Sequence, residues 1–348
     1  MKIAFFDAKP YDKDSFNDIN QKFGYDIKYF KFHLSLDNVD LVKGYEVVCA
    51  FVNDLIDKDI IDKLYENGVR LIALRSAGFN NVDFKAAYGK IHIVRVPAYS
   101  PHAIAEHTVG LMLTLDRKIY RAYNRTREFN FTLQGLLGFD LFGKTAGVIG
   151  TGRIGRVLIK ILKGFEMNVL AYDPHPDPDF AREIGCTFTD LDTIFAQSDV
   201  ISLNCPLTKE TEYLINEQNI AKMKDGVMIL NTGRGKLINT LDLIEGLKTG
   251  KIGSAGLDVY EEESDYFYED LSDSVVVDDT LARLLSFNNV IVTSHQGFFT
   301  REALTKIAEV TLQNIRDFEE GKSLENEICY QCLESGTNCR KKQGKQCF

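Results

Sequence analysis

The segment Thr145-Ala146-Gly147-Val148-Ile149-Gly150-Thr151-Gly152-Arg153-Ile154-Gly155 decides the fold of this chain. Its first five residues form a short apolar run of the kind that builds a buried strand, and its last six match the pattern G-x-G-x-x-G. Apolar residues at helical spacing follow over 154–165, and a second apolar run, 168–172, leads into Asp173. We therefore predict a strand–turn–helix–strand unit of the Rossmann type.

The three glycines match the demands of a dinucleotide site. Gly150 allows the tight turn, Gly152 lets backbone amides approach a pyrophosphate, and Gly155 lets helix and strand pack closely. The pyrophosphate would lie on the helix N-terminus, where free N–H groups favour anions. Asp173 would accept hydrogen bonds from the ribose hydroxyls and repel a 2′-phosphate, so we predict NAD rather than NADP. The alternative is a strand–turn–helix unit that binds no nucleotide.

Composition limits the functions that this unit can serve. The 348 residues are 45% hydrophobic and 26% charged, with a net charge of −9. An acidic protein is a poor candidate for binding nucleic acid or anionic lipid, because both need a basic surface. No apolar run approaches the ~18 residues that span a bilayer, and Asp7 interrupts the N-terminal apolar stretch before a signal-peptide core can form. We expect a cytoplasmic protein.

Strand-like and helix-like segments alternate along most of the chain, which is typical of parallel sheets with helices on both faces. Pro97 and Pro101 interrupt the pattern, one helix is predicted over 103–121, and a second crossing follows His295, before a helix over 301–319. We predict an α/β protein of two doubly wound parallel-sheet domains. A Rossmann NAD domain, 101–296, is inserted in a flavodoxin-like substrate domain, 1–100 plus 297–328. The expected strands are 2–6, 46–51, 71–74, 91–94, 145–149, 168–172, 199–203, 227–231, 252–257 and 290–293.

Polar residues follow several of these strands directly. Cys205 and Pro206 follow one strand, Arg234 a second and His295 a third. Ligands of open parallel sheets bind beyond the carboxyl ends of the strands, so we expect these residues to converge on one crevice.

Taken together, these motifs resemble the D-isomer-specific 2-hydroxyacid dehydrogenase family. Gly150–Gly155, Asn231–Gly235, Gly256–Glu263 and His295 occur in the family's order and approximate spacing, and the resemblance covers nearly all of residues 1–328. The chain looks most like the bacterial fermentative D-lactate dehydrogenases. The segments that suggest this branch are Ala73–Asp83, Val96–Ser100, Tyr266–Asp270 and Ser294–Gln296.

The resemblance implies that pyruvate, or another small 2-keto acid, is reduced with NADH, and that Arg234, Glu263 and His295 are catalytic. His295 would donate a proton to the carbonyl oxygen. Glu263 would pair with the imidazolium, and Arg234 would hold the substrate carboxylate. Each residue also has an ordinary structural alternative: a strand-end histidine, a helix-capping arginine and a solvated run of glutamates. A different class of function on the same fold is an NADH-sensing binding protein or corepressor.

The resemblance also implies residues that bind substrate and cofactor. The backbone of Ala77 and Gly78 would receive the substrate carboxylate, and Tyr99 and Phe298 would wall a small pocket, unless they only pack in the core. Asp258 would reach the nicotinamide amide, whereas His102 and His107 are expected to pack. The positions that would line the cofactor are Arg153, Ile154, Cys205, Pro206, Thr232 and Asp258.

Two features lie beyond the catalytic residues. The resemblance suggests a homodimer or homotetramer, with the helix over 103–121 as interface. The tail, 329–348, departs from the family and carries Cys329, Cys332, Cys339 and Cys347. These cysteines could ligate zinc, but their outer spacing is loose and we predict no metal.

Overall fold

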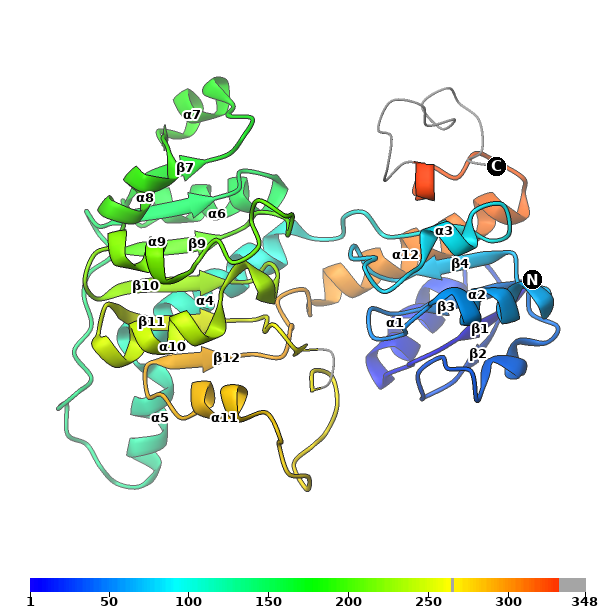
Figure 1. The fold of residues 1–348 in the computed structure, drawn as a ribbon, viewed down its shortest axis with the longest axis horizontal. Coiled ribbons are helices and arrows are strands. Elements are labelled where there is room, and N and C mark those ends of the chain that lie inside the picture. The colour runs from blue at the N-terminus through cyan, green and yellow to red at the C-terminus, as the bar shows by residue number, and fades with distance from the viewer. Residues whose placement is uncertain (264–265, 332–348) are drawn as a thin grey trace. The chain divides into compact units, whose positions relative to one another are not determined.

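The computed structural model describes residues 1–263 and 266–331. The chain divides into two compact units. Unit 1 comprises Met1–Ser100 and the described residues from Phe299 onward, and unit 2 comprises Pro101–Phe298. Figure 1 shows one sheet with its own helices in each unit. Of the tail cysteines, Cys332, Cys339 and Cys347 lie outside the described residues.

Unit 1 contains a five-stranded parallel sheet of order β2-β1-β3-β4-β5, the flavodoxin-like order that we predicted. Its second strand was not expected, because Asp26 and Lys28 alternate with half-buried residues and leave no apolar run. The strands are β1 (Lys2–Phe5), β2 (Asp26–Tyr29), β3 (Val47–Ala50), β4 (Leu71–Leu74) and β5 (His92–Val94).

Helices cover both faces of this sheet. Phe5 of β1 contacts Phe16 of α1, with ring centroids 4.9 Å apart, whereas its neighbours Ala4 and Phe6 share a core with Ile61 of α2. Successive side chains of a strand point to opposite faces, so α1 and α2 lie on opposite sides. The helices of unit 1 are α1 (Pro10–Asn20), the 3₁₀ helix η1 (Val39–Val42), α2 (Lys58–Glu66), α3 (Phe84–Ala87) and α12 (Arg301–Glu319).

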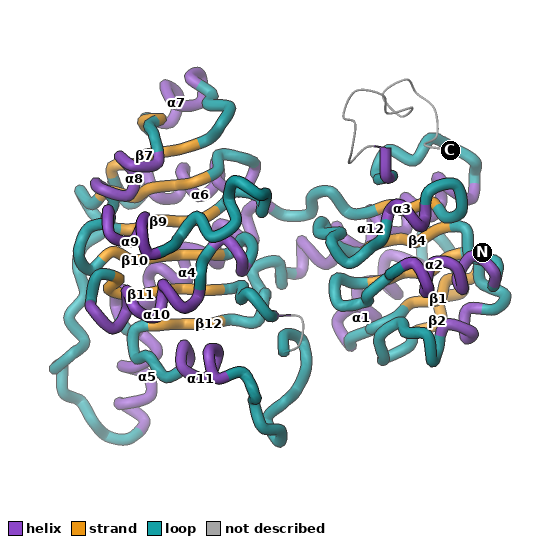
Figure 2. The backbone as a smooth tube through the Cα atoms, in the orientation of Figure 1, coloured by secondary structure: helices purple, strands orange, loops and turns teal. Residues whose placement is uncertain are grey.

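Unit 2 contains a seven-stranded parallel sheet of order β12-β11-β10-β9-β6-β7-β8. Figures 1 and 2 label β12, β11, β10, β9 and β7 in this sheet. Counted from β6, this is the Rossmann order 3-2-1-4-5-6 with one further strand, so this prediction is also confirmed. The two-residue β8 was too short to predict. The strands are β6 (Thr145–Ile149), β7 (Asn168–Tyr172), β8 (Thr187–Phe188), β9 (Val200–Leu203), β10 (Val227–Asn231), β11 (Ile252–Leu257) and β12 (Val290–Val292).

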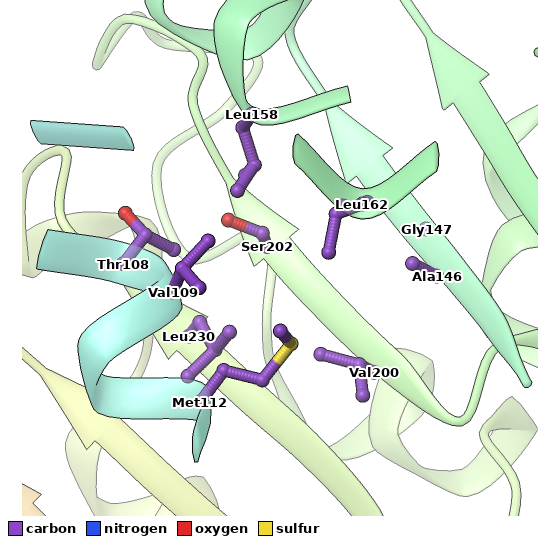
Figure 3. Close-up of a pocket in the computed structure, with 10 residues that line it drawn as sticks. All are labelled: Thr108, Val109, Met112, Ala146, Gly147, Leu158, Leu162, Val200, Ser202 and Leu230. Carbon is purple, nitrogen blue, oxygen red and sulfur yellow. The ribbon is translucent and has the colours of Figure 1, made fainter. Parts of the chain in front are cut away.

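The helices of unit 2 form two layers, one on each face of the sheet. On one face α4 and α6 pack together over the central strands, and a small apolar cavity remains between them (Figure 3). A second core cluster covers the other face. The helices are α4 (Pro101–Arg117), α5 (Ile119–Arg127), α6 (Arg153–Gly164), α7 (Pro178–Ile184), α8 (Leu191–Gln197), α9 (Glu217–Lys222), the 3₁₀ helix η2 (Gly235–Leu237), α10 (Thr240–Thr249) and α11 (Asp279–Leu285). Among the described residues, none of the helices is long and apolar enough to cross a membrane.

The prediction of one helix over 103–121 was wrong. Lys118 adopts a left-handed conformation with φ of 50°, which ends α4 and starts α5 in a new direction. The Lys118 ammonium donates to the carbonyl oxygens of Asp116 and Leu137, and these bonds stabilise the break. Apolar periodicity cannot reveal such a break, because residues on both sides of it are helical.

Candidate active site

The glycine-rich turn between β6 and α6 has no room for side chains at two of its three glycines. A Cβ atom at Gly155 would lie 2.0 Å from the carbonyl oxygen of Gly150, and one at Gly150 would lie 2.6 Å from the backbone of Asn204. A Cβ at Gly152 would meet nothing within 4 Å. The turn is therefore closed toward the protein and open above Gly152, where a ligand can approach the backbone.

The N-terminus of α6 is free to bind an anion. No described side chain caps it, and its first turn holds no acidic residue. Beside it, the Asp173 carboxylate accepts hydrogen bonds from the Thr151 amide (2.8 Å) and hydroxyl (3.0 Å). Burial works against the charged form of Asp173, but these bonds and one from the His175 amide keep its pKa below the usual value. Free amides and an ionised carboxylate are what the pyrophosphate and ribose of NAD require.

The three predicted catalytic residues follow three neighbouring strands of the same sheet: Arg234 follows β10, Glu263 follows β11 and His295 follows β12. The Nδ1 atom of His295 lies 2.9 Å from the Oε1 atom of Glu263. Both side chains are partly exposed, at 23% and 26%. The Arg234 guanidinium donates to the carbonyl oxygen of Gly233 at 2.7 Å, and the Asn231 amide donates to the carbonyl oxygen of Arg234.

The structure distinguishes the three glutamates of the acidic run. Glu261 accepts hydrogen bonds from the Thr240 amide and the Tyr213 hydroxyl, so it anchors the start of α10. Glu262 is exposed. Glu263 alone of the three contacts His295, and its second oxygen accepts a bond from the Tyr260 amide.

Asp258, predicted to reach the nicotinamide amide, is held by hydrogen bonds to the segment around His295. It is 1% exposed, and its carboxylate accepts hydrogen bonds from the Gln296 and Gly297 amides and the Thr293 hydroxyl. His107, assigned to packing in the sequence analysis, places its Nε2 atom 3.3 Å from the Asp258 carboxylate. This contact joins α4 to the segment that carries His295.

The other predicted cofactor residues lie at strand ends or on α6. Arg153 and Ile154 occupy its first turn, and Cys205 and Pro206 follow β9. Burial raises the pKa of the Cys205 thiol to about 11. The Thr232 hydroxyl, after β10, lies 2.9 Å from the hydroxyl of Thr108 on α4.

In unit 1, the predicted carboxylate-binding turn follows β4. No described residue accepts a hydrogen bond from the backbone N–H of Ala77 or Gly78. The turn is held by the Ser76 hydroxyl, which donates to the Gly78 carbonyl oxygen at 2.8 Å, and by Arg95, which donates to the Ala77 carbonyl oxygen at 2.7 Å. The unengaged amides are suited to an anion.

The two aromatic residues predicted to wall the pocket belong to different units. Tyr99 is half-buried near the end of the first segment of unit 1, and Phe298 is buried at the end of unit 2. Sequence reasoning missed His107 and Arg95, since neither lies in a motif.

Comparison with known proteins identifies the class of protein. Residues 109–297 match the family model described as "D-isomer specific 2-hydroxyacid dehydrogenase, NAD binding domain". A "2-hydroxyacid dehydrogenase homolog" of Haemophilus influenzae is 54% identical, over 94% of this chain and 98% of that protein. The D-lactate dehydrogenase of Escherichia coli is 51% identical over 94% of this chain and 100% of its own.

Solved structures agree with the sequence matches. The apo-structure of the E. coli D-lactate dehydrogenase superimposes with a TM-score of 0.87 and 49% identity, covering 94% of this chain and 100% of that chain. The pyruvate reductase of Chlamydomonas reinhardtii gives a TM-score of 0.90 and 40% identity, covering 94% and 98%.

The chain therefore belongs to the D-isomer-specific 2-hydroxyacid dehydrogenase family. It is an NAD-dependent 2-hydroxyacid dehydrogenase, which interconverts a small 2-hydroxy acid and its 2-keto acid.

Proposed function

We propose that this enzyme is a D-lactate dehydrogenase that reduces pyruvate, with His295 as the proton donor. The observation that carries the proposal is the 2.9 Å pairing of His295 with Glu263 beyond the carboxyl ends of the sheet. Similarity to the E. coli D-lactate dehydrogenase and the Chlamydomonas pyruvate reductase supports the choice of substrate.

The proton step follows from the hydrogen bonding of the imidazole. NADH, when bound, supplies the hydride. Glu263 engages the Nδ1 atom of His295, so Nε2 is the nitrogen that transfers a proton to the substrate carbonyl oxygen. The carboxylate stabilises the imidazolium before transfer, and the neutral imidazole serves as the base in the reverse reaction.

Two groups of this chain would bind the substrate carboxylate. The Arg234 guanidinium is a planar donor suited to a carboxylate and can polarise the neighbouring carbonyl. The unengaged amides of Ala77 and Gly78 offer further donors. Tyr99 and Phe298 would limit the space for the substrate side chain, which favours a methyl group.

A panel of 2-keto acids with NADH, followed by chiral analysis of the product, tests the substrate. We expect pyruvate to give the highest kcat/KM and D-lactate as the product. If a larger 2-keto acid gave a higher kcat/KM, that acid would replace pyruvate as the proposed substrate. NADH binding without turnover of any 2-keto acid would instead support an NADH-sensing binding protein.

Substitutions at the paired residues test the mechanism. We expect H295A to lower kcat by about 10²–10⁴-fold, the usual contribution of a general acid, with little change in the Kd of NADH. E263Q should also lower kcat, whereas E262Q, at the exposed neighbour, should not. Wild-type turnover by H295A would exclude His295 as the proton donor.

We also propose that the enzyme is a homo-oligomer. The residues 119–142, which we term the apolar arm, include α5, which buries none of its residues, and the loop that follows it (Figure 1). Phe129, Leu133 and Leu137 in the arm are 83, 82 and 88% exposed. Clustered exposed apolar side chains favour association, and a second copy of the chain is the occupant that we propose.

Sedimentation measurements test this association. The double variant L133D/L137D should sediment as a monomer, because the negative charges on the arms of the two copies would repel each other. The control L55D alters an exposed leucine in unit 1, outside the arm, and should stay associated. A monomeric wild type would refute the proposal.

A cytoplasmic location completes the proposal. Cys49, Cys186 and Cys205 are unpaired thiols, as is usual in a reducing compartment. Cell fractionation tests it, and recovery of the enzyme outside the cytoplasmic fraction would contradict it.

A further inference from the structure

The segment that carries His295 has a conformation that needs external support. His295 itself has φ of 51°, in the left-handed region that few residues other than glycine occupy. Such a conformation persists only where surrounding contacts determine it. Several contacts at this position come from Asp258, the residue that follows β11, and the Tyr268 hydroxyl adds a hydrogen bond to the His295 carbonyl oxygen at 3.1 Å.

Asp258 binds three consecutive amides of the segment. Its backbone carbonyl oxygen accepts a bond from the His295 amide at 2.8 Å. Its carboxylate accepts one bond from the Gln296 amide and one from the Gly297 amide, both at 2.8 Å. The carboxylate thus fixes the backbone immediately after His295.

A buried carboxylate is costly unless hydrogen-bonding partners surround it. Among the described residues, the only basic side chain in an ion-pair contact with Asp258 is His107 of α4, whose Nε2 atom lies 3.3 Å from Oδ1. The same Nε2 atom lies 3.1 Å from the Thr293 hydroxyl, which donates to the Asp258 Oδ1 atom at 2.6 Å. Burial disfavours the charged Asp258, but its bonds with His107 and Thr293 keep its pKa below the usual value.

The packing around these groups is close. A Cβ atom at Gly297 would lie 2.9 Å from the Asp258 carboxylate and 3.5 Å from the His107 ring. The carboxylate therefore leaves no room for a Cβ atom beside the segment, and the His107 ring lies at van der Waals distance from that position.

We propose that His107 is a positioning residue: through the Asp258 carboxylate it holds the backbone on which His295 lies. The effect on turnover rests on the proposed role of His295 as proton donor. The effect on the backbone does not, and it can be measured separately.

The test compares H107L, H107Q and the control H102Q. Leucine removes the ring nitrogens at similar volume, and glutamine keeps an amide that can reach the same hydrogen-bond partners. His102 is exposed on the same helix. Hydrogen exchange followed by mass spectrometry of the peptide that covers 293–298 measures how well its backbone amides are protected. Steady-state kinetics with NADH and pyruvate measure kcat and KM.

For H107L we expect exchange at 296–297 to accelerate about tenfold or more, the loss expected when a buried hydrogen bond to a charged group is weakened. We expect kcat to fall by a similar factor, while the KM for pyruvate and the Kd of NADH change little. H107Q should recover part of both losses, and H102Q should match the wild type. These results together support the positioning role.

Unchanged exchange in a folded H107L would overturn the inference, whatever happens to kcat. Accelerated exchange with unchanged kcat would show that the conformation of this segment does not affect turnover, and it would also overturn the positioning role. If H107L does not fold, H107Q decides by the same measurements, and wild-type exchange together with wild-type kcat in that variant refutes the role. Failure of the H295A test would instead point to a different proton donor and leave the exchange result intact.

Discussion

The Arg95 side chain fixes the orientation of a backbone donor, the Gly78 N–H. Its guanidinium holds the Ala77 carbonyl oxygen at 2.7 Å. The C=O and N–H of a trans peptide point in opposite directions because the peptide is planar. Arg95 on one side of the Ala77–Gly78 peptide therefore turns the Gly78 N–H toward the other side, where we propose that the substrate carboxylate binds.

Substitution of Arg95 should therefore weaken substrate binding more than it slows the chemical step. We expect R95Q to raise the KM for pyruvate about tenfold, since a hydrogen bond from a charged group is worth about 1.5–3 kcal/mol. R95K, which keeps the charge without the planar donor, should be intermediate. R70Q is the control, because the Arg70 guanidinium bonds to the carbonyl oxygens of Tyr65 and Val69, away from this turn. An unchanged KM in R95Q would show that the turn needs no such support.

Cys205 should be unreactive despite its position beside the proposed cofactor site. Burial raises its pKa to about 11, so at pH 8 only about one thiol in a thousand is ionised, and the thiolate is the reactive form. We expect iodoacetamide at pH 8 to leave Cys205 unmodified in the native enzyme, and alkylation to accelerate as the pH approaches 11. Peptide mass spectrometry, with denatured protein as the control, measures this, and rapid native modification at pH 8 would contradict it.

Individual residues were predictable where a motif identified them. Gly150, Asp173 and Arg234 follow apolar strands within short sequence patterns. His107 could not be found in this way, because its partner Thr293 lies 186 residues further along the chain and only the fold brings them together. Asp258 was predicted as a cofactor residue, but its bonds to the backbone after His295 leave no pattern in the sequence.

At the scale of elements, strands were easiest to predict when both of their faces are buried. β4, β6 and β10 match the predicted bounds, since a parallel strand covered on both faces reads as a continuous apolar run. β7 and β11 are partly exposed, and their bounds also match. The edge strand β2 is partly exposed and has no such run. The break at Lys118 was missed because a left-handed lysine leaves no pattern in the sequence.

The turn before α6 offers a test in which two glycines should behave differently. In G155A the new Cβ would lie 2.0 Å from a backbone oxygen, so we expect a loss of stability of about 1–3 kcal/mol together with loss of NADH binding. In G152A the methyl group enters open space, so the fold should keep its stability while NADH binds more weakly. Thermal unfolding and NADH titration measure both, and equal behaviour of the two variants would contradict this account.

At the scale of the whole molecule, each unit has a sheet and a hydrophobic core of its own. The glycine-rich turn and Asp173 both belong to unit 2. A ligand stabilises the part of a protein that binds it, by about 2.7 kcal/mol at a hundred times its Kd.

We therefore expect NADH to slow hydrogen exchange in β6, β7 and β9 more than in β1, β3 and β4. Mass spectrometry of peptides from both sheets, with and without NADH, measures the difference. Equal protection of the two sheets would mean that the units do not respond separately, and G152A serves as a control in which the protection should diminish.

The interruption of unit 1 by unit 2 has a consequence for biosynthesis. Residues 1–100 are translated before unit 2 and include all five strands of their sheet, but α12, which packs against α1 and β4, is translated only after the whole of unit 2. One face of the nascent sheet of unit 1 therefore stays incompletely covered until α12 is translated. The inserted Rossmann unit emerges with all its strands and can fold first. Chaperone binding during translation is thus expected to concentrate on residues 1–100 rather than on unit 2.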